Sequence, residues 1–420
     1  TPGRRRAPSA RKSDRTSYDE MLKLASAGAG VMHSRSIEFA KKYRVPLRVR
    51  PSYSDEQGTL ITVEPTTGAR VVTGVALVRD ECRVSLCDIP DQPGVMSLIL
   101  TKMSEHQIPV DMVVQDVATE GLARVSFTVP QDELAETLTA ASQAILAVGS
   151  GRVEQGTNVS KVSVVGAGMR SHTGVAAEMF RALSEADINI QMITTSEIKI
   201  SVLVDREKCD AAVQVTHEVF GLSQPFTSGL SVGFDHRPTD VAVSAPREEL
   251  EREVVAQLAS MEGIVVSEIQ LDSNQARVTV SQLPDRPGVV AAIFAAVAEG
   301  GVMVDMIVQN VSQSGQAHLS FTILRDDLEQ CLLLTREVLE AFPGAEISYS
   351  DHIAKLTVNG IGLRSHVGVG QKMFRALAEA SINVKLVNTS EMRISAVVDR
   401  SQGTAAHNAL LQAFNLPAAG

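Results

Sequence analysis

The sequence lacks the features of secreted, membrane-spanning and nucleic-acid-binding proteins. Its four cysteines, at positions 82, 87, 209 and 331, include no CxxC pair, which favours buried thiols in a reduced, cytoplasmic setting. The longest apolar run, 288–298, is too short to cross a bilayer, and we expect no signal peptide before the globular sequence. The net charge of −10 argues against nucleic acid or an anionic membrane as a partner.

Motifs of catalysis and cofactor binding are also missing. Gly166-Ala167-Gly168 follows a strand pattern, but Ser171 stands where a dinucleotide-binding loop needs its third glycine. A phosphate-binding loop ending in GKS or GKT is absent. The nine histidines are scattered, and no Ser, His and Asp order stands out. We therefore predict no catalytic residue, no metal site and no cofactor held by this chain.

What the sequence does contain is a long internal repeat. Residues 161–205 return at 355–399 with 25 identities in 45 positions. The same offset of 194 relates Gly94 to Gly288 (288 − 94 = 194) and Phe127 to Phe321 (321 − 127 = 194), so a whole block is duplicated. Within 161–205, period-2 and period-3.6 patterns predict a strand, a helix and two strands, which is half of a ferredoxin-like βαββαβ unit.

The predicted fold class is α+β, with four ferredoxin-like units in two duplicated pairs. A chain of 420 residues is expected to form several domains. We divide it into 1–68, read as the tail of an α/β lobe; 69–222, the first pair; 223–263, a connector; and 264–420, the second pair. The connector is expected to hold a strand at 241–243 and a helix at 246–261. In the first pair, 71–78 and 82–87 are predicted as two separate strands.

Two Asp-x-Pro-Gly turns, 91–94 and 285–288, are the best candidates for ligand binding. Each lies between a predicted strand and a predicted helix, where first-turn N–H groups attract an anion and the aspartate attracts a cation. That pair of charges suits a free amino acid. The alternative is a plain helix cap, but two occurrences in register, each followed by Asp-Met and Gln, favour a ligand site.

Several segments resemble the tandem ACT regulatory domains of aspartate kinases. They are DQPGVM, VDMVVQDV, VSVVGAGMRSHTGV and INIQMITTSEIKISVLV, and residues 14–50 resemble the end of that family's kinase lobe. In the family the first ACT unit is inserted in the second, which would send strand 71–78 into the second unit's sheet. By matching motif, the resemblance implies effector-binding residues in both copies. In the first copy these are Asp91, Pro93, Gly94, Val95, Met96, Asp111, Gln115, Asn189, Ile190 and Ser196; in the second they are Asp285, Pro287, Gly288, Val289, Val290, Asp305, Gln309, Asn383, Val384 and Ser390.

The resemblance implies a regulatory role under feedback control by lysine, threonine or both. The family converts ATP and L-aspartate to 4-phospho-L-aspartate, with Mg-ATP needed by the complete enzyme. Its KFGG-type segment and nucleotide loop are expected upstream of Thr1, so this chain is expected to be inactive alone. A homodimer paired through ACT units is also expected. The alternative is a stand-alone amino-acid sensor; an ACT-bearing dehydrogenase would need a Rossmann half that residues 1–70 do not supply.

Overall fold

The computed structural model describes residues 9–30, 32–63, 70–117, 121–224, 265–311, 315–361, 368–390 and 392–417. The strand and the helix predicted for the connector, at 241–243 and 246–261, lie outside these ranges. No helix in the described ranges is both long enough and apolar enough to span a membrane.

The N-terminal block is a small α/β layer with its own core. A three-stranded sheet, in the order β1-β3-β2, packs on two helices through Tyr18, Leu22, Ile37 and Ile61. The first helix begins at a capping box, in which Ser17 and Glu20 bond each other's backbone N–H groups. Its elements are β1 (Arg15–Ser17), α1 (Tyr18–Leu24), η1 (Ala25–Ala29), α2 (Ser34–Lys42), β2 (Leu47–Val49) and β3 (Thr59–Thr62).

Four ferredoxin-like units follow, as the repeat predicts. Four long strands each run through two units, and the other strands and the helices belong to one unit each. The shared strands are β4 (Gly74–Pro90), β7 (Arg152–Val165), β10 (Val265–Pro284) and β13 (Glu346–Ile361). Unit 1 adds α3 (Val95–Glu105), β5 (Asp111–Val117), β6 (Leu122–Pro130) and α4 (Leu134–Val148), and unit 2 adds α5 (Val175–Glu185), β8 (Met192–Ser196), β9 (Lys199–Asp205) and α6 (Cys209–Val219). Unit 3 adds α8 (Val289–Glu299), β11 (Val304–Val311), β12 (Gln316–Leu324) and α9 (Leu328–Leu339), and unit 4 adds α10 (Gly368–Glu379), β14 (Leu386–Ser390), β15 (Arg393–Asp399) and α11 (Gly403–Phe414).

The prediction of separate strands at 71–78 and 82–87 was wrong, because one 17-residue strand, β4, runs through both. Its register slips between Val78 and Glu81, and this irregularity carries the strand from one unit's sheet into the next without a break. Residues 74–78 pair with 161–165 of β7, which itself pairs with β9. The start of β4 therefore lies in unit 2, as the insertion of unit 1 within unit 2 requires.

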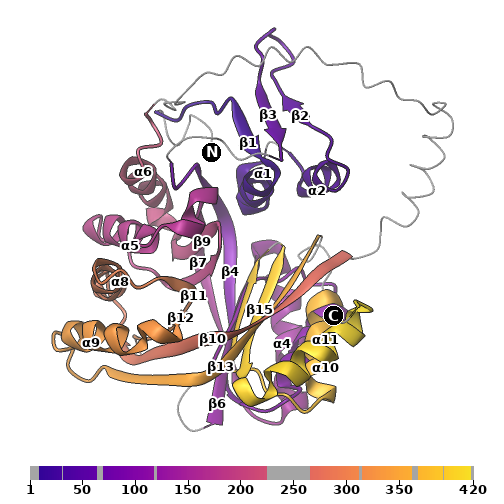
Figure 1. Ribbon diagram of the computed structural model, residues 1–420, viewed down its shortest axis with the longest axis vertical. Helices are drawn as coiled ribbons and strands as arrows, with labels where there is room; N and C mark the ends of the chain where they lie inside the picture. Colours follow the sequence, from indigo (N-terminus) through magenta and orange to yellow (C-terminus); the bar gives the residue numbers. More distant parts are fainter. Residues whose placement is uncertain are drawn as a thin grey trace, which may run out of the picture.

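Edge strands of the two copies pair with each other. β5 of unit 1 pairs antiparallel with β14 of unit 4, and β8 of unit 2 pairs with β11 of unit 3. Within the described residues the twelve strands of the units close into one barrel. Helices of units 2 and 3 cover one side of this sheet and helices of units 1 and 4 the other (Figure 1). The edge pairing that a homodimer would supply is thus made between the two halves of one chain.

The core has an outer and an inner part. Two large apolar clusters lie under the helices, one shared by units 2 and 3 and the other by units 1 and 4. A third fills the inside of the barrel and includes Met112, Leu203 and Met306. Strand β9 therefore buries both faces, with Val202 under the helices and Leu203 inside.

Candidate ligand-binding sites

Each Asp-x-Pro-Gly turn meets an asparagine from the other copy. Gly94 and Gly288 begin α3 and α8 with φ of 94° and 95°, a conformation that glycine adopts without strain. Asn383 Nδ2 donates to Asp91 Oδ1 over 2.9 Å, and Asn189 Nδ2 donates to Asp285 Oδ1 over 2.7 Å. Each turn is thereby fastened to the neighbouring unit through its aspartate.

A glutamine fastens the same pairs of units a second time. Gln115 Nε2 donates to the Val384 carbonyl over 2.7 Å, and Gln309 Nε2 donates to the Ile190 carbonyl over 2.9 Å. The resemblance grouped these residues by copy, but the structure groups them across copies. Because β5 pairs with β14 and β8 with β11, the turn of one copy always faces the Asn-Ile or Asn-Val step of the other.

The cavities at the two turns are small. Each has a volume of about 20 Å³, and the predicted residues Pro93, Val95 and Met96 line one of them. Pro287, Val289 and Val290 line the other. This space holds about one water molecule. A free amino acid therefore fits only if the asparagine and the turn move apart.

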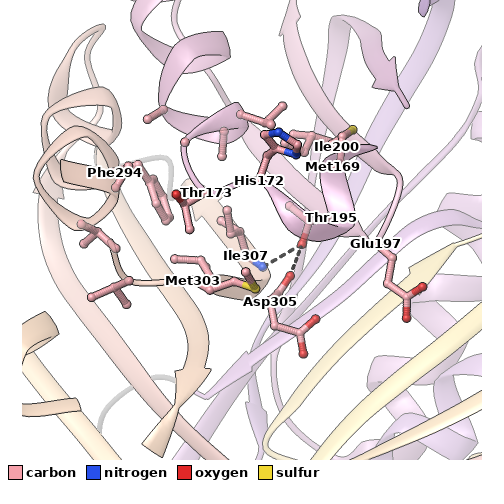
Figure 2. Close-up of a pocket in the computed structure, with 18 of the residues that line it drawn as sticks. Met169, His172, Thr173, Thr195, Glu197, Ile200, Phe294, Met303, Asp305 and Ile307 are labelled. Carbon is pink, nitrogen blue, oxygen red and sulfur yellow. Dashed lines mark hydrogen bonds between the residues drawn. The ribbon is translucent and has the colours of Figure 1, made fainter. Parts of the chain in front are cut away.

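A much larger pocket lies between units 2 and 3, with a volume of about 550 Å³. Phe294 and Met303 approach it from unit 3, and Met169 and His172 from unit 2 (Figure 2). Its floor carries Thr195, whose Oγ1 accepts from the Ile307 N–H over 2.9 Å and donates to the Asp305 carbonyl over 3.1 Å. The start of α5, at Gly174, points its first turn at the same space.

The polar lining of this pocket is rich in carboxylates. Glu197 forms an ion pair with Arg393 over 2.5 Å, and Asp305 forms one with Lys355. Asp272 also lines the pocket, and the buried Ser196 hydroxyl has no hydrogen-bond partner among the described residues. Carboxylates receive an ammonium group, an unpaired hydroxyl accepts or donates a bond, and helix N-terminal amides receive a carboxylate. The arrangement can hold a zwitterion with a second positive charge.

Several predicted residues lie away from the turns. Ser196 and Asp305 line the large pocket. Asp111 is buried in an ion pair with Lys161, and Ser390 accepts a hydrogen bond from Lys23. Sequence reasoning missed Glu197, although the repeated TSE step at 195–197 and 389–391 was a signal for it.

The potential metal ligands and the cysteines of the described residues form no further candidate site. They contain no group of three His, Cys, Asp or Glu side chains that could hold a metal ion. All four cysteines are free and buried, and burial raises the pKa of the Cys87 and Cys331 thiols to about 11. Such thiols stay protonated and unreactive at neutral pH.

Comparisons with known proteins find similarity to ACT domains and to aspartate kinases. A family model described as an ACT domain matches residues 162–220 and 356–414. An aspartokinase of Pseudomonas aeruginosa is 42% identical over 225 residues, covering 53% of this chain and 55% of that protein. An aspartokinase of Helicobacter pylori is 42% identical over 220 residues, covering 51% of this chain and 54% of that protein. The crystal structure of aspartate kinase from Synechocystis superposes with a TM-score of 0.73 at 29% identity, covering 99% of this chain and 70% of that one. The chain spans about half the length of the curated relatives that it matches.

Proposed function

Because this chain is similar to aspartate kinases and carries two ACT-domain matches, we propose that its two ACT pairs form the amino-acid-binding regulatory region of such an enzyme. The observation that carries the proposal is the 550 Å³ pocket between units 2 and 3. It brings an apolar wall, a helix N-terminus and carboxylates together in one pocket. Regulation would follow if the ligand binds one arrangement of the two units better than another.

Lysine is the effector whose chemistry fits this pocket. Its α-carboxylate would face the first turn of α5, and its aliphatic stem would lie on Phe294 and Ile307. Its ε-ammonium would reach Glu197. The two Asp-x-Pro-Gly turns suit a smaller amino acid such as threonine, and binding there would exchange the Asn383–Asp91 and Asn189–Asp285 bonds for bonds to the ligand.

The catalytic role of the whole enzyme is part of the same proposal. Neither the KFGG-type segment nor a nucleotide loop occurs in this sequence, so we expect ATP and aspartate to be turned over only with those elements supplied. A homodimer, predicted from the resemblance, would use surfaces other than β5, β8, β11 and β14, because these edges are paired within the chain. Because the chain pairs these edges by itself, a stand-alone amino-acid sensor is the second candidate function.

A melting scan against the twenty amino acids tests the proposal. A ligand at about one hundred times its dissociation constant stabilises the folded state by about 2.7 kcal/mol. We expect lysine to raise the midpoint of the parent, and Glu197→Gln to remove most of that rise. Glu178→Gln, on the same unit but outside the pocket lining, is the matched control. No shift with any amino acid would overturn the proposed function; adding Mg-ATP and aspartate then separates the enzyme from the sensor.

A further inference from the structure

The duplication allows two equivalent interfaces to be compared within one chain. At the first, Thr195 Oγ1 accepts from the Ile307 N–H over 2.9 Å; at the second, Thr389 Oγ1 accepts from the Val113 N–H over 3.0 Å. Both pairs of positions differ by 194 (389 − 195 and 307 − 113). The interface of unit 4 with unit 1 therefore repeats that of unit 2 with unit 3, including the strand floor of the large pocket.

The two interfaces differ at the next residue. Ser196, in the large pocket, has a buried hydroxyl that bonds to no group in the described part of the chain. Its counterpart Ser390 accepts a hydrogen bond from Lys23 Nζ over 3.0 Å. Lys23 lies on α1 of the N-terminal block, and only 4% of its surface is exposed. At the second interface, the ammonium group of Lys23 thus occupies the position beside Ser390. At the first interface, the equivalent position beside Ser196 belongs to the open pocket.

The N-terminal block that carries Lys23 packs closely on unit 2. Glu20, 1% exposed, accepts from Thr73 Oγ1 over 3.0 Å and from the Ala167 N–H over 3.2 Å. Gly28 lies so close to the start of β4 that an added Cβ would come within 2.7 Å of the Leu77 carbonyl oxygen. These contacts hold the block on unit 2, so that Lys23 reaches across to unit 4.

Burial of a lysine ammonium is costly unless polar groups replace its water. A side chain that is almost fully buried between two units is therefore held by groups suited to an ammonium ion. The lysine side chain is also the part of free lysine that our proposed function places beside Glu197 in the large pocket.

We propose that the Lys23 side chain fills the pocket position beside Ser390, at the interface of units 4 and 1. There it takes the place that a free amino acid takes at the interface of units 2 and 3. The statement rests on the proposed function for the identity of the free ligand, but not for the ammonium site itself. It follows that the chain offers one open pocket of this kind instead of two. The N-terminal block and a free lysine compete for the position beside Ser390.

Chemical rescue tests the ammonium site without reference to regulation. Lys23→Ala removes the ammonium and most of its stem, and n-butylammonium supplies both. We expect n-butylammonium to raise the melting temperature of Lys23→Ala in a saturable way, and by more than it raises that of the parent. Lys41→Ala, which removes the part-exposed partner of Asp19 on the same block, is the matched control and should show no rescue. If n-butylammonium and n-butanol act alike on Lys23→Ala, no ammonium site exists there.

Lysine binding then tests the competition. Glu197→Gln should abolish lysine binding at the open pocket, and the double variant Lys23→Ala with Glu197→Gln should regain one lysine per chain by isothermal titration. Lys23→Met, which keeps the stem but not the charge, should regain less. A folded double variant that binds no lysine, although the parent does, would overturn the proposal. If the parent itself binds no amino acid, the proposed function fails, and the rescue experiment alone decides the role of Lys23.

Discussion

Replacing Lys161 with methionine should destabilise the fold far more than the same replacement at its repeat partner, Lys355. Lys161 is 1% exposed inside the barrel, with its Nζ 2.5 Å from Asp111 and 3.1 Å from Glu81. Methionine has a similar length but no charge, so it leaves two buried carboxylates without their cation. Removing one partner of a buried ion pair costs about 3–5 kcal/mol.

The repeat supplies the control for this experiment. Lys355 pairs with Asp305, whose side chain is 32% exposed and can be hydrated when its partner is lost. The pair is part-exposed, with 14% of the Lys355 side chain accessible, and a pair that water reaches contributes less than a fully buried one, so Lys355→Met should be milder than Lys161→Met. Both replacements put the same side chain on the same position of β7 or β13, which cancels the effects of methionine itself.

Urea unfolding followed by circular dichroism would measure the difference. We expect the unfolding free energy of Lys161→Met to lie at least about 2 kcal/mol below that of Lys355→Met, with unchanged denaturant dependence. Hydrogen exchange along β7 should report the same loss locally. Equal effects of the two replacements would refute the reasoning, because burial would then not set the strength of these pairs.

Three further predictions concern other parts of the chain. Gly28→Ala should destabilise the chain more than Gly149→Ala in the same melting assay, because both have a positive φ but only Gly28 would contact a neighbour. Burial lowers the pKa of His318, so it gains a proton on unfolding; stability should fall as pH drops below about 6.5, and His318→Gln should flatten the pH dependence of urea unfolding. A coupled assay with Mg-ATP and aspartate should show no aspartyl phosphate formation by this chain above a no-protein control.

The repeat and its periodicity were enough to predict the four ferredoxin-like units, because local patterns reveal each strand and helix. They did not reveal that β4 is one strand, since the residues between Val78 and Glu81 carry no signal that distinguishes a register slip from a turn. Nor did they reveal which copy faces which. Pairing of β5 with β14 depends on edges more than 250 positions apart, and no local pattern encodes such a contact.

The candidate site shows the same limit. The turns at 91–94 and 285–288 were found from their motif, and the asparagines grouped with them by copy lie beside the turn of the other copy. The resemblance implied Ser196 and Asp305 as effector-binding residues, and both line the large pocket. That pocket escaped detection because its walls come from units 2 and 3, and only the folded chain brings them together. The contact of Lys23 with Ser390, 367 positions away, was equally invisible.

The pairing of edges within one chain changes how such a regulatory region responds to dilution. When two separate chains supply the two halves of a ligand site, the number of sites depends on protein concentration and falls when the protein is scarce. Here the strands that pair, β5 with β14 and β8 with β11, belong to one polypeptide chain, so each half meets the other at a fixed effective concentration. The affinity for an effector should therefore be the same in a dilute extract as at high expression.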